Sequence, residues 1–271
     1  MKNDRLNFPE SYISYVKSWP KFKNTEMLND FPKNGIILHD TNLEAHLSGI
    51  GIDEKNITRV RIGTSMPGSI LLIESTDQYP HYFIAEGLPG GSGISTLAAE
   101  LFALGADNIV HIGLCALLGG LLASGVPILA LGAHKDSVAT LLSDDEDSGL
   151  LAFPSNQLND ALLTTFKKQN KSLTLAYGYT TPIFYFQSKK LVQDLILRNA
   201  TAGGESMSYI EMEQASLFQA AKIMKKNAAS IVIGSDRYSL VNGIVTHKFE
   251  DDFDQDELER EVLKFAIRAF V

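Results

Sequence analysis

Short apolar runs that alternate with helix-like segments are the feature that most constrains the fold of this 271-residue chain. Runs typical of buried strands cover residues 35–39, 57–63, 69–74, 81–85, 108–113, 127–131, 173–179 and 229–235. Helices are predicted over residues 43–47, 94–104, 158–169, 191–199, 213–226 and 256–271. Because this alternation persists along the chain, it predicts an α/β protein in which helices cover two faces of one sheet.

One domain is favoured, because no fixed-period repeat and no low-complexity linker divides the sequence. The first thirty residues differ from the rest: aromatic side chains mix with lysines, and Pro9, Pro20 and Pro32 punctuate short helical pieces. We therefore expect an N-terminal extension, residues 1–34, that packs on a domain formed by residues 35–271.

Composition excludes several classes of protein. With 45% apolar residues, 21 Gly and 9 Pro, the chain is neither disordered nor collagen-like. Its 24 Lys and Arg against 32 Asp and Glu give a net charge of -8, whereas a nucleic-acid backbone is bound by clustered cations. Nucleic acid is therefore not an expected partner, and the sequence predicts neither a metal nor an organic cofactor.

The cellular location is predicted from cysteine usage and from the apolar stretches. A single cysteine, Cys115, forms no intrachain disulfide, and residues 1–20 lack the features of a signal peptide. The longest apolar stretch, residues 109–131, is broken by His111, several glycines and Pro127, so it predicts strand, turn and strand, with no membrane span. We expect a soluble cytoplasmic protein without a membrane partner.

A glycine-rich segment between a predicted strand and a predicted helix is the first candidate site. It reads Gly90-Gly91-Ser92-Gly93. Glycines let backbone amides approach an anion closely, and the following helix N-terminus favours negative charge. A segment of this kind also serves close packing alone, and its spacing fits neither common phosphate-binding pattern. Both interpretations stay open.

Two acidic motifs follow. Glu211 and Glu213 flank Met212 before an apolar helix, and we expect only one of the two acids to face a ligand. The alternative is that these acids complement the helix dipole. Asp236 and Arg237 follow a buried strand, where open α/β sheets bind ligands, although a structural Asp–Arg turn has the same sequence.

Taken together, the motifs resemble the nucleoside phosphorylase superfamily that contains uridine phosphorylase and hexameric purine nucleoside phosphorylase. The similarity runs from about Gly35 to the C-terminus and is firmest over residues 90–132, followed by Glu-Met-Glu at 211–213 and Ser-Asp at 235–236. The resemblance implies a single-domain, three-layer α/β/α fold with a central mixed, twisted sheet. It also implies a homo-oligomer, a dimer or a hexamer, with sites near subunit interfaces.

The resemblance assigns a nucleoside pocket. Glu213 is expected to bind the ribose hydroxyls, with Met212 under the sugar and Glu211 near the base. Phe184 falls where the family stacks an aromatic ring on the base. Two further substrate-lining positions are Cys115 and Ala116.

A catalytic acid is implied at Asp236, which would protonate a purine leaving group with help from Arg237. Cleavage of the C–N bond builds positive charge on the sugar and negative charge on the base, and both must be stabilised. Asp236 favours a purine, whereas Lys190, near the position of a base-reading arginine in uridine enzymes, favours a pyrimidine.

The implied phosphate site departs from the family. The family's Gly-Asp-Pro loop with its arginine becomes His39-Asp40-Thr41-Asn42-Leu43, and a second arginine and a threonine are replaced by His111 and Leu114. Candidate phosphate contacts are therefore His39, Gly90, His111 and Leu114, with Arg59 or Arg61 supplied by a neighbouring subunit. Because a phosphate dianion relies on several charge-assisted donors, losing two arginines weakens this site severely.

The alternative interpretation of the histidine and the cysteine is structural. A lone histidine on an apolar strand, as His111 is here, is more often a satisfied core residue than an anion ligand. Cys115 has no base beside it in the sequence pattern and is expected to be a small buried apolar residue.

Three functions remain open. The chain is an enzyme that cleaves nucleosides with phosphate as co-substrate, a phosphate-independent nucleosidase, or a nucleoside-binding homologue without activity. Retention of Glu213 and Asp236 favours catalysis, and loss of the phosphate cations disfavours ordinary phosphorolysis.

Overall fold

The computed structural model describes residues 9–10, 14, 30–39, 43–60, 70–76, 79–143, 147–185, 187–198 and 200–270. Most of the predicted extension and Arg61 lie outside these residues, so the predictions made for them stay untested.

The described chain alternates strands and helices, as its apolar pattern predicts. The helices are α2 (Leu43–Gly49), α3 (Gly90–Leu104), α4 (Ser137–Leu142), α5 (Asn156–Lys168), α6 (Lys189–Ile196), α7 (Gln214–Met224) and α8 (Gln255–Arg268). The strands are β1 (Asn34–Leu38), β2 (Ile57–Val60), β3 (Ile70–Ile73), β4 (Tyr82–Glu86), β5 (Asn108–Leu118), β6 (Ile128–His134), β7 (Leu151–Ala152), β8 (Thr174–Thr180), β9 (Thr201–Ala202), β10 (Glu205–Glu211), β11 (Asn227–Val241) and β12 (Ile244–Phe249).

The strands form one mixed sheet, in the order β12-β11-β6-β8-β10-β5-β1-β4-β3-β2. β1 runs parallel to both β4 and β5, whereas β10 pairs with β5 in the antiparallel sense. β11 also pairs with β5 in parallel, so β5, β11, β6, β8 and β10 close into a ring. The sequence analysis predicts layers but not this ring, because the ring depends on which distant segments pair with one another.

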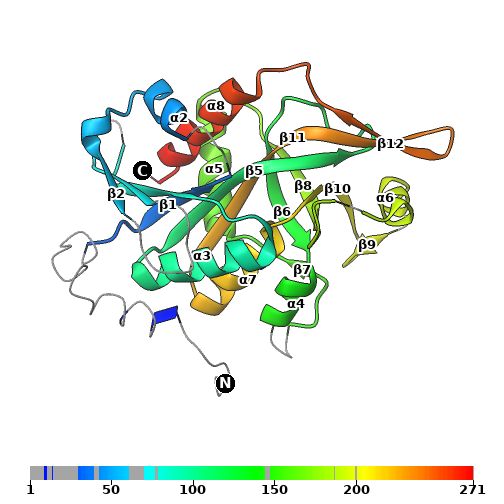
Figure 1. Cartoon of the computed structure of the whole chain (residues 1–271), viewed down its shortest axis with the longest axis horizontal. Coiled ribbons are helices and arrows are strands. Elements are labelled where there is room, and N and C mark those ends of the chain that lie inside the picture. Colours follow the sequence, from blue (N-terminus) through cyan, green and yellow to red (C-terminus); the bar gives the residue numbers. More distant parts are fainter. Residues whose placement is uncertain are drawn as a thin grey trace.

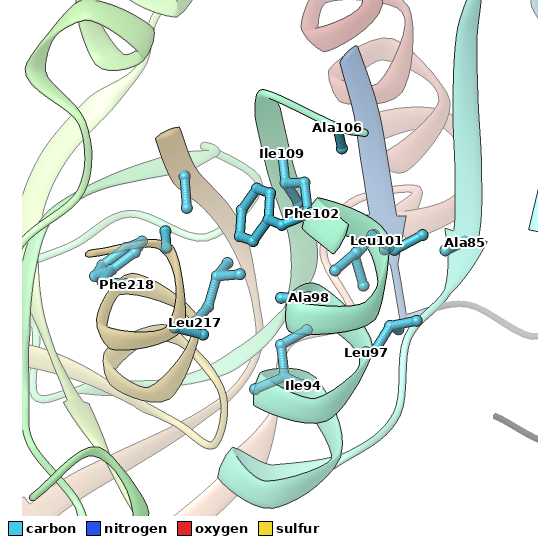
Figure 2. Packing of buried hydrophobic residues seen from close by; sticks show 14 of the residues in the cluster. Ala85, Ile94, Leu97, Ala98, Leu101, Phe102, Ala106, Ile109, Leu217 and Phe218 are labelled. Carbon is cyan, nitrogen blue, oxygen red and sulfur yellow. The ribbon is translucent and has the colours of Figure 1, made fainter. Parts of the chain in front are cut away.

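Helices cover both faces of the sheet: α3, α4 and α7 lie on one side and α2, α5 and α8 on the other (Figure 1). Figure 2 shows Phe102 of α3 on the side of Leu217 of α7, and Leu101 of the same helix on the side of Ala85. A second apolar cluster lies under α5 and α8. The predicted three-layer architecture with a central mixed sheet is confirmed.

Helix α3 begins earlier than the sequence predicts. Its first turn is the glycine-rich segment itself, starting at Gly90, so the predicted start at Ile94 is wrong. The glycines permit close packing: a Cβ on Gly91 would lie 2.5 Å from the Ser216 hydroxyl, and one on Gly93 would lie 2.9 Å from the Leu88 Cβ. Steric fit therefore accounts for two of these glycines.

The C-terminal strands are longer than predicted. β11 continues beyond residue 235 and turns at Asn242–Gly243 into β12, which forms with it a hairpin that projects from the body in Figure 1. The mixed polar and apolar side chains of this hairpin obscured its strand pattern. Among the described residues, no helix combines the length and the apolar character that a membrane crossing needs.

Candidate active site

Strand β5 lies at the centre of the candidate site, between β10 and β11. Ala116 pairs with Ile210 of β10 on one side and with Asp236 of β11 on the other. The register of β11 shifts between Gly234 and Asp236, which is the signature of a β-bulge. The end of β10 and the bulge in β11 thereby place Glu211 and Asp236 on the two sides of this segment of β5.

Cys115 lies between these acids and is almost fully buried. Burial, together with the negative charges of Asp236 and Glu211, raises the pKa of its thiol well above the ordinary value. Since the thiolate is the reactive form, Cys115 serves as a small apolar wall, as the structural alternative predicts.

Glu211 ends β10 and caps the helix that follows. Its carboxylate accepts hydrogen bonds from the backbone amides of Glu213 at 2.6 Å and Gln214 at 2.7 Å, and from the hydroxyl of Thr180. Burial, and then the charge of Glu213, raises the pKa of Glu211 to about 8 against these bonds. Glu211 therefore has the structural role of holding the start of the helix, through hydrogen bonds from its first backbone amides.

Glu213 lies outside the strand, at the N-terminal cap of α7, so alternation along a strand does not govern its direction. One carboxylate oxygen accepts the amide of Gly90 at 2.7 Å, and the other accepts the amide of Met212 at 3.2 Å. The helix N-terminus predicted to bind phosphate thus holds a carboxylate of the protein itself. Met212 lies beside Gly90, its methyl carbon 3.8 Å from the position of a Cβ there.

His39 and His111 meet next to Glu213. The Nδ1 atom of His39 lies 2.9 Å from Nε2 of His111, whose Nδ1 lies 2.8 Å from the hydroxyl of Ser230. One ring nitrogen of each histidine and one carboxylate oxygen of Glu213 lie within 4.8 Å of one another. Burial, and then the neighbouring His39, lowers the pKa of His111 well below its ordinary value, so His111 supplies no cation.

Asp236 faces the hairpin. One of its carboxylate oxygens lies 2.8 Å from the hydroxyl of Ser235, and the other lies 2.6 Å from Nε2 of His247 on β12. The Asp236 side chain is 18% exposed, so solvent or a ligand can reach it. The acid predicted for the leaving group thus has a histidine partner.

Arg237 turns away from Asp236, as neighbouring positions of a strand do. Its guanidinium donates to the carboxylate of Glu250, to the carbonyl oxygens of Gly119 and Leu122, and to the hydroxyl of Ser124. The structure therefore does not bring Arg237 to Asp236; the side chain ties the loop between β5 and β6 to the end of β12.

Replacing Arg237 by methionine is expected to destabilise the fold by about 3 kcal/mol, because it strips the buried Glu250 of its charged partner. Urea unfolding at pH 7 measures this loss. The control is Lys190→Met, which breaks an exposed ion pair with Asp194 and should leave stability almost unchanged. Equal losses of stability in the two variants would contradict the structural role of the Arg237–Glu250 ion pair.

The same variant should change the response to acid. Burial by itself would raise the pKa of Glu250, but hydrogen bonds from Ser124 and Arg237 outweigh it and lower the pKa below the ordinary 4.5. A lowered pKa in the folded state gives stability that is present above pH 4.5 and is lost as the pH falls below it. The Arg237 variant should lose less stability over that interval than the unaltered protein.

Other predicted site residues lie apart from this cluster. Phe184 is 68% exposed and makes an edge-on contact with Tyr185, with ring centroids 4.7 Å apart. Leu114 packs against the apolar cluster under α5 and α8, on the face of β5 opposite to His111, and its predicted phosphate role stays a prediction. Arg59 is exposed on β2, at the other end of the sheet order.

Several residues that form hydrogen bonds with the site residues were not predicted from the sequence. They are Thr180, Gln214, Ser230 and His247. Three of them are buried polar residues in apolar segments, and that contrast is the one signal that pointed to them. His247 had no such signal, because its strand was not predicted.

Comparison with known proteins defines the class to which this fold and site belong. A model of the phosphorylase superfamily matches residues 58–269. The chain belongs to the phosphorylase superfamily, which confirms the predicted family.

Two solved structures share the fold. AMP nucleosidase from Bacteroides thetaiotaomicron VPI-5482 has 16% sequence identity and a TM-score of 0.70, over 97% of this chain and 96% of that chain. Purine nucleoside phosphorylase from Toxoplasma gondii, in complex with immucillin-H, has 16% identity and a TM-score of 0.68, over 89% and 91%. At these identities the likeness shows the fold.

Proposed function

We propose that the protein cleaves the N-glycosidic bond of a nucleoside. The observation that carries the proposal is the placement of acids around one segment of β5: Glu211 and Asp236 flank Cys115 and Ala116, and Glu213 follows two residues after Glu211. These are the positions at which the family resemblance expects the sugar and the base.

The chemistry of the bond fits this arrangement. When the C–N bond breaks, positive charge develops on the sugar, and the carboxylate of Glu213 stabilises it. The electron pair of the bond moves to the base, which needs a proton, and Asp236 delivers it with His247 hydrogen-bonded to its second oxygen. Glu211 supports both steps by holding the start of α7, and thus Glu213, in place.

The acceptor of the sugar distinguishes two forms of this function. Phosphate as co-substrate would make the protein a nucleoside phosphorylase, and water would make it a nucleosidase. The lowered pKa of His111, at a position where the family resemblance expects an arginine, favours the second form.

The test is a panel of purine and pyrimidine nucleosides, incubated with the full chain in the presence and absence of phosphate. Free base and sugar 1-phosphate are followed by chromatography. We expect base release from at least one nucleoside. Binding without release would identify a nucleoside-binding homologue and would contradict the proposed activity.

A homo-oligomer, a dimer or a hexamer, is part of the proposal. Phe184 and Tyr185 are large aromatic side chains that are 68% and 69% exposed, as residues buried by a second subunit would be. Sedimentation velocity at micromolar protein concentration measures the state, and a monomer throughout would contradict this part.

A further inference from the structure

A continuous chain of hydrogen bonds runs from the core to His39. The Tyr209 hydroxyl lies 2.8 Å from Oε1 of Gln214, whose Nε2 lies 3.0 Å from the Ser230 hydroxyl. Ser230 in turn lies 2.8 Å from Nδ1 of His111, and Nε2 of His111 lies 2.9 Å from Nδ1 of His39. These five residues, which we name the relay, come from β10, α7, β11 and β5 and from the residue after β1.

The amide of Gln214 fixes the direction of the first two bonds. The Tyr209 hydroxyl donates to the amide oxygen of Gln214, so the amide nitrogen, which only donates, points at Ser230. Ser230 accepts from Gln214, and its own proton can be donated to Nδ1 of His111. In that direction the proton of His111 is on Nε2 and is donated to Nδ1 of His39.

With the bonds in this direction, the proton of His39 is on Nε2. That atom is buried and has no hydrogen-bond partner among the residues that the structure describes. The ring lies flat on Gly87, where a Cβ would approach Nε2 to 2.5 Å, so the glycine makes room for this position. A buried N–H donor without an acceptor is costly, and it is expected to meet an oxygen.

We propose that the relay holds His39 as an Nε2–H donor for an uncharged oxygen, the water that attacks the sugar. This inference rests on the proposed function and names its acceptor. One ring nitrogen of His39 and one carboxylate oxygen of Glu213 lie within 4.8 Å of each other, so an oxygen bound at His39 lies beside the carboxylate of Glu213.

The reaction balances with these groups. The water oxygen forms a bond to C1′ of the sugar while the bond from C1′ to the base nitrogen breaks. The water proton passes to the carboxylate of Glu213, and the base nitrogen keeps the electron pair of the broken bond and takes a proton through Asp236. Free sugar and free base are the products, and no phosphate is consumed. Ser230 and Gln214 act as positioning residues through His111.

A metal ion is the competing occupant, because two histidines and a carboxylate are common metal ligands. In this structure, however, the facing nitrogens of His39 and His111 share a hydrogen bond. The lone pair of the accepting nitrogen is therefore occupied, and the donating nitrogen carries a proton that a metal ion would have to displace. Metal analysis of the purified protein is therefore an arm of the test.

The first experiment reads the tautomers directly. Nitrogen-15 NMR of histidine side chains in the full chain should show His39 and His111 with the proton on Nε2 between pH 6 and pH 8. Ser230→Ala should abolish this preference at His111, whereas Ser239→Ala, on the same strand but outside the relay, should preserve it. A proton on Nδ1 of His39, or one equivalent of bound transition metal per chain, would overturn the proposal.

The second experiment follows the oxygen. In 18O-labelled water without phosphate, base release should place the label on the released sugar. His39→Ala should lower kcat at least ~100-fold with little change in the nucleoside KM, and His39→Gln should restore part of the rate. Release that requires phosphate would overturn the inference alone, whereas no release from any nucleoside would overturn the proposed function and the water-binding role together.

Discussion

Replacing Glu213 by glutamine is expected to lower kcat/KM for nucleoside cleavage by a factor of ~10² to 10³. The substitution keeps the shape of the side chain and an oxygen that can accept the Gly90 amide, but removes the negative charge that faces the developing positive charge of the sugar. Steady-state rates of base release, with circular dichroism to show that the variant is folded, measure the effect.

Two other glutamates provide controls. Glu205 is exposed at the start of β10, the strand that precedes Glu213, and Glu205→Gln should leave the rate of base release unchanged. Below pH 8, Glu211→Gln should lower kcat/KM much less than Glu213→Gln does. The raised pKa of Glu211 leaves its carboxyl group largely protonated in that range, and glutamine resembles the protonated form. Equal losses at positions 205, 211 and 213 would contradict the role of Glu213.

Replacing Asp236 by asparagine is the second large effect, with an expected loss of about a thousandfold in kcat for a purine nucleoside. Asparagine occupies the same space but cannot pass a proton to the leaving base. The diagnostic measurement uses a second substrate, p-nitrophenyl riboside, whose leaving group departs without protonation. On that substrate the variant should lose less than about tenfold.

Asp251→Asn is the matched control for this prediction, since Asp251 is exposed just beyond β12. It should cleave both substrates at the unaltered rate. If Asp236→Asn instead lost the same factor on both substrates, Asp236 would act by position or stability, and the role of proton donor would be wrong.

Local patterns predicted the elements that bury an apolar face. Strands β1, β4 and β8 and helices α3, α5 and α8 were found near their true positions, because the repeat of apolar side chains reflects burial directly. The start of α3 was misplaced, because a glycine-rich first turn carries no apolar repeat. β12 was missed for a related reason: five of its six residues are exposed and the sixth is partly exposed, so its side chains show no regular alternation of burial.

The candidate site divides in the same way. The acids at positions 211, 213 and 236 and the replacement of the phosphate cations were visible in the sequence. The direction of each side chain was not, because direction depends on how distant segments pack. Glu213 was predicted at the start of a helix and does cap α7, but only the tertiary structure places its carboxylate against the amide of Gly90.

The order of apolar runs and the sequence motifs were therefore sufficient to predict the superfamily and the layered fold. The partners of His111 depended on tertiary structure. His111 seemed a lone histidine in the sequence, yet its two partners lie 72 and 119 positions away, at His39 and Ser230. Parallel pairing of β5 with β1 and with β11 brings these three residues together, and no local pattern records which distant strands will be neighbours.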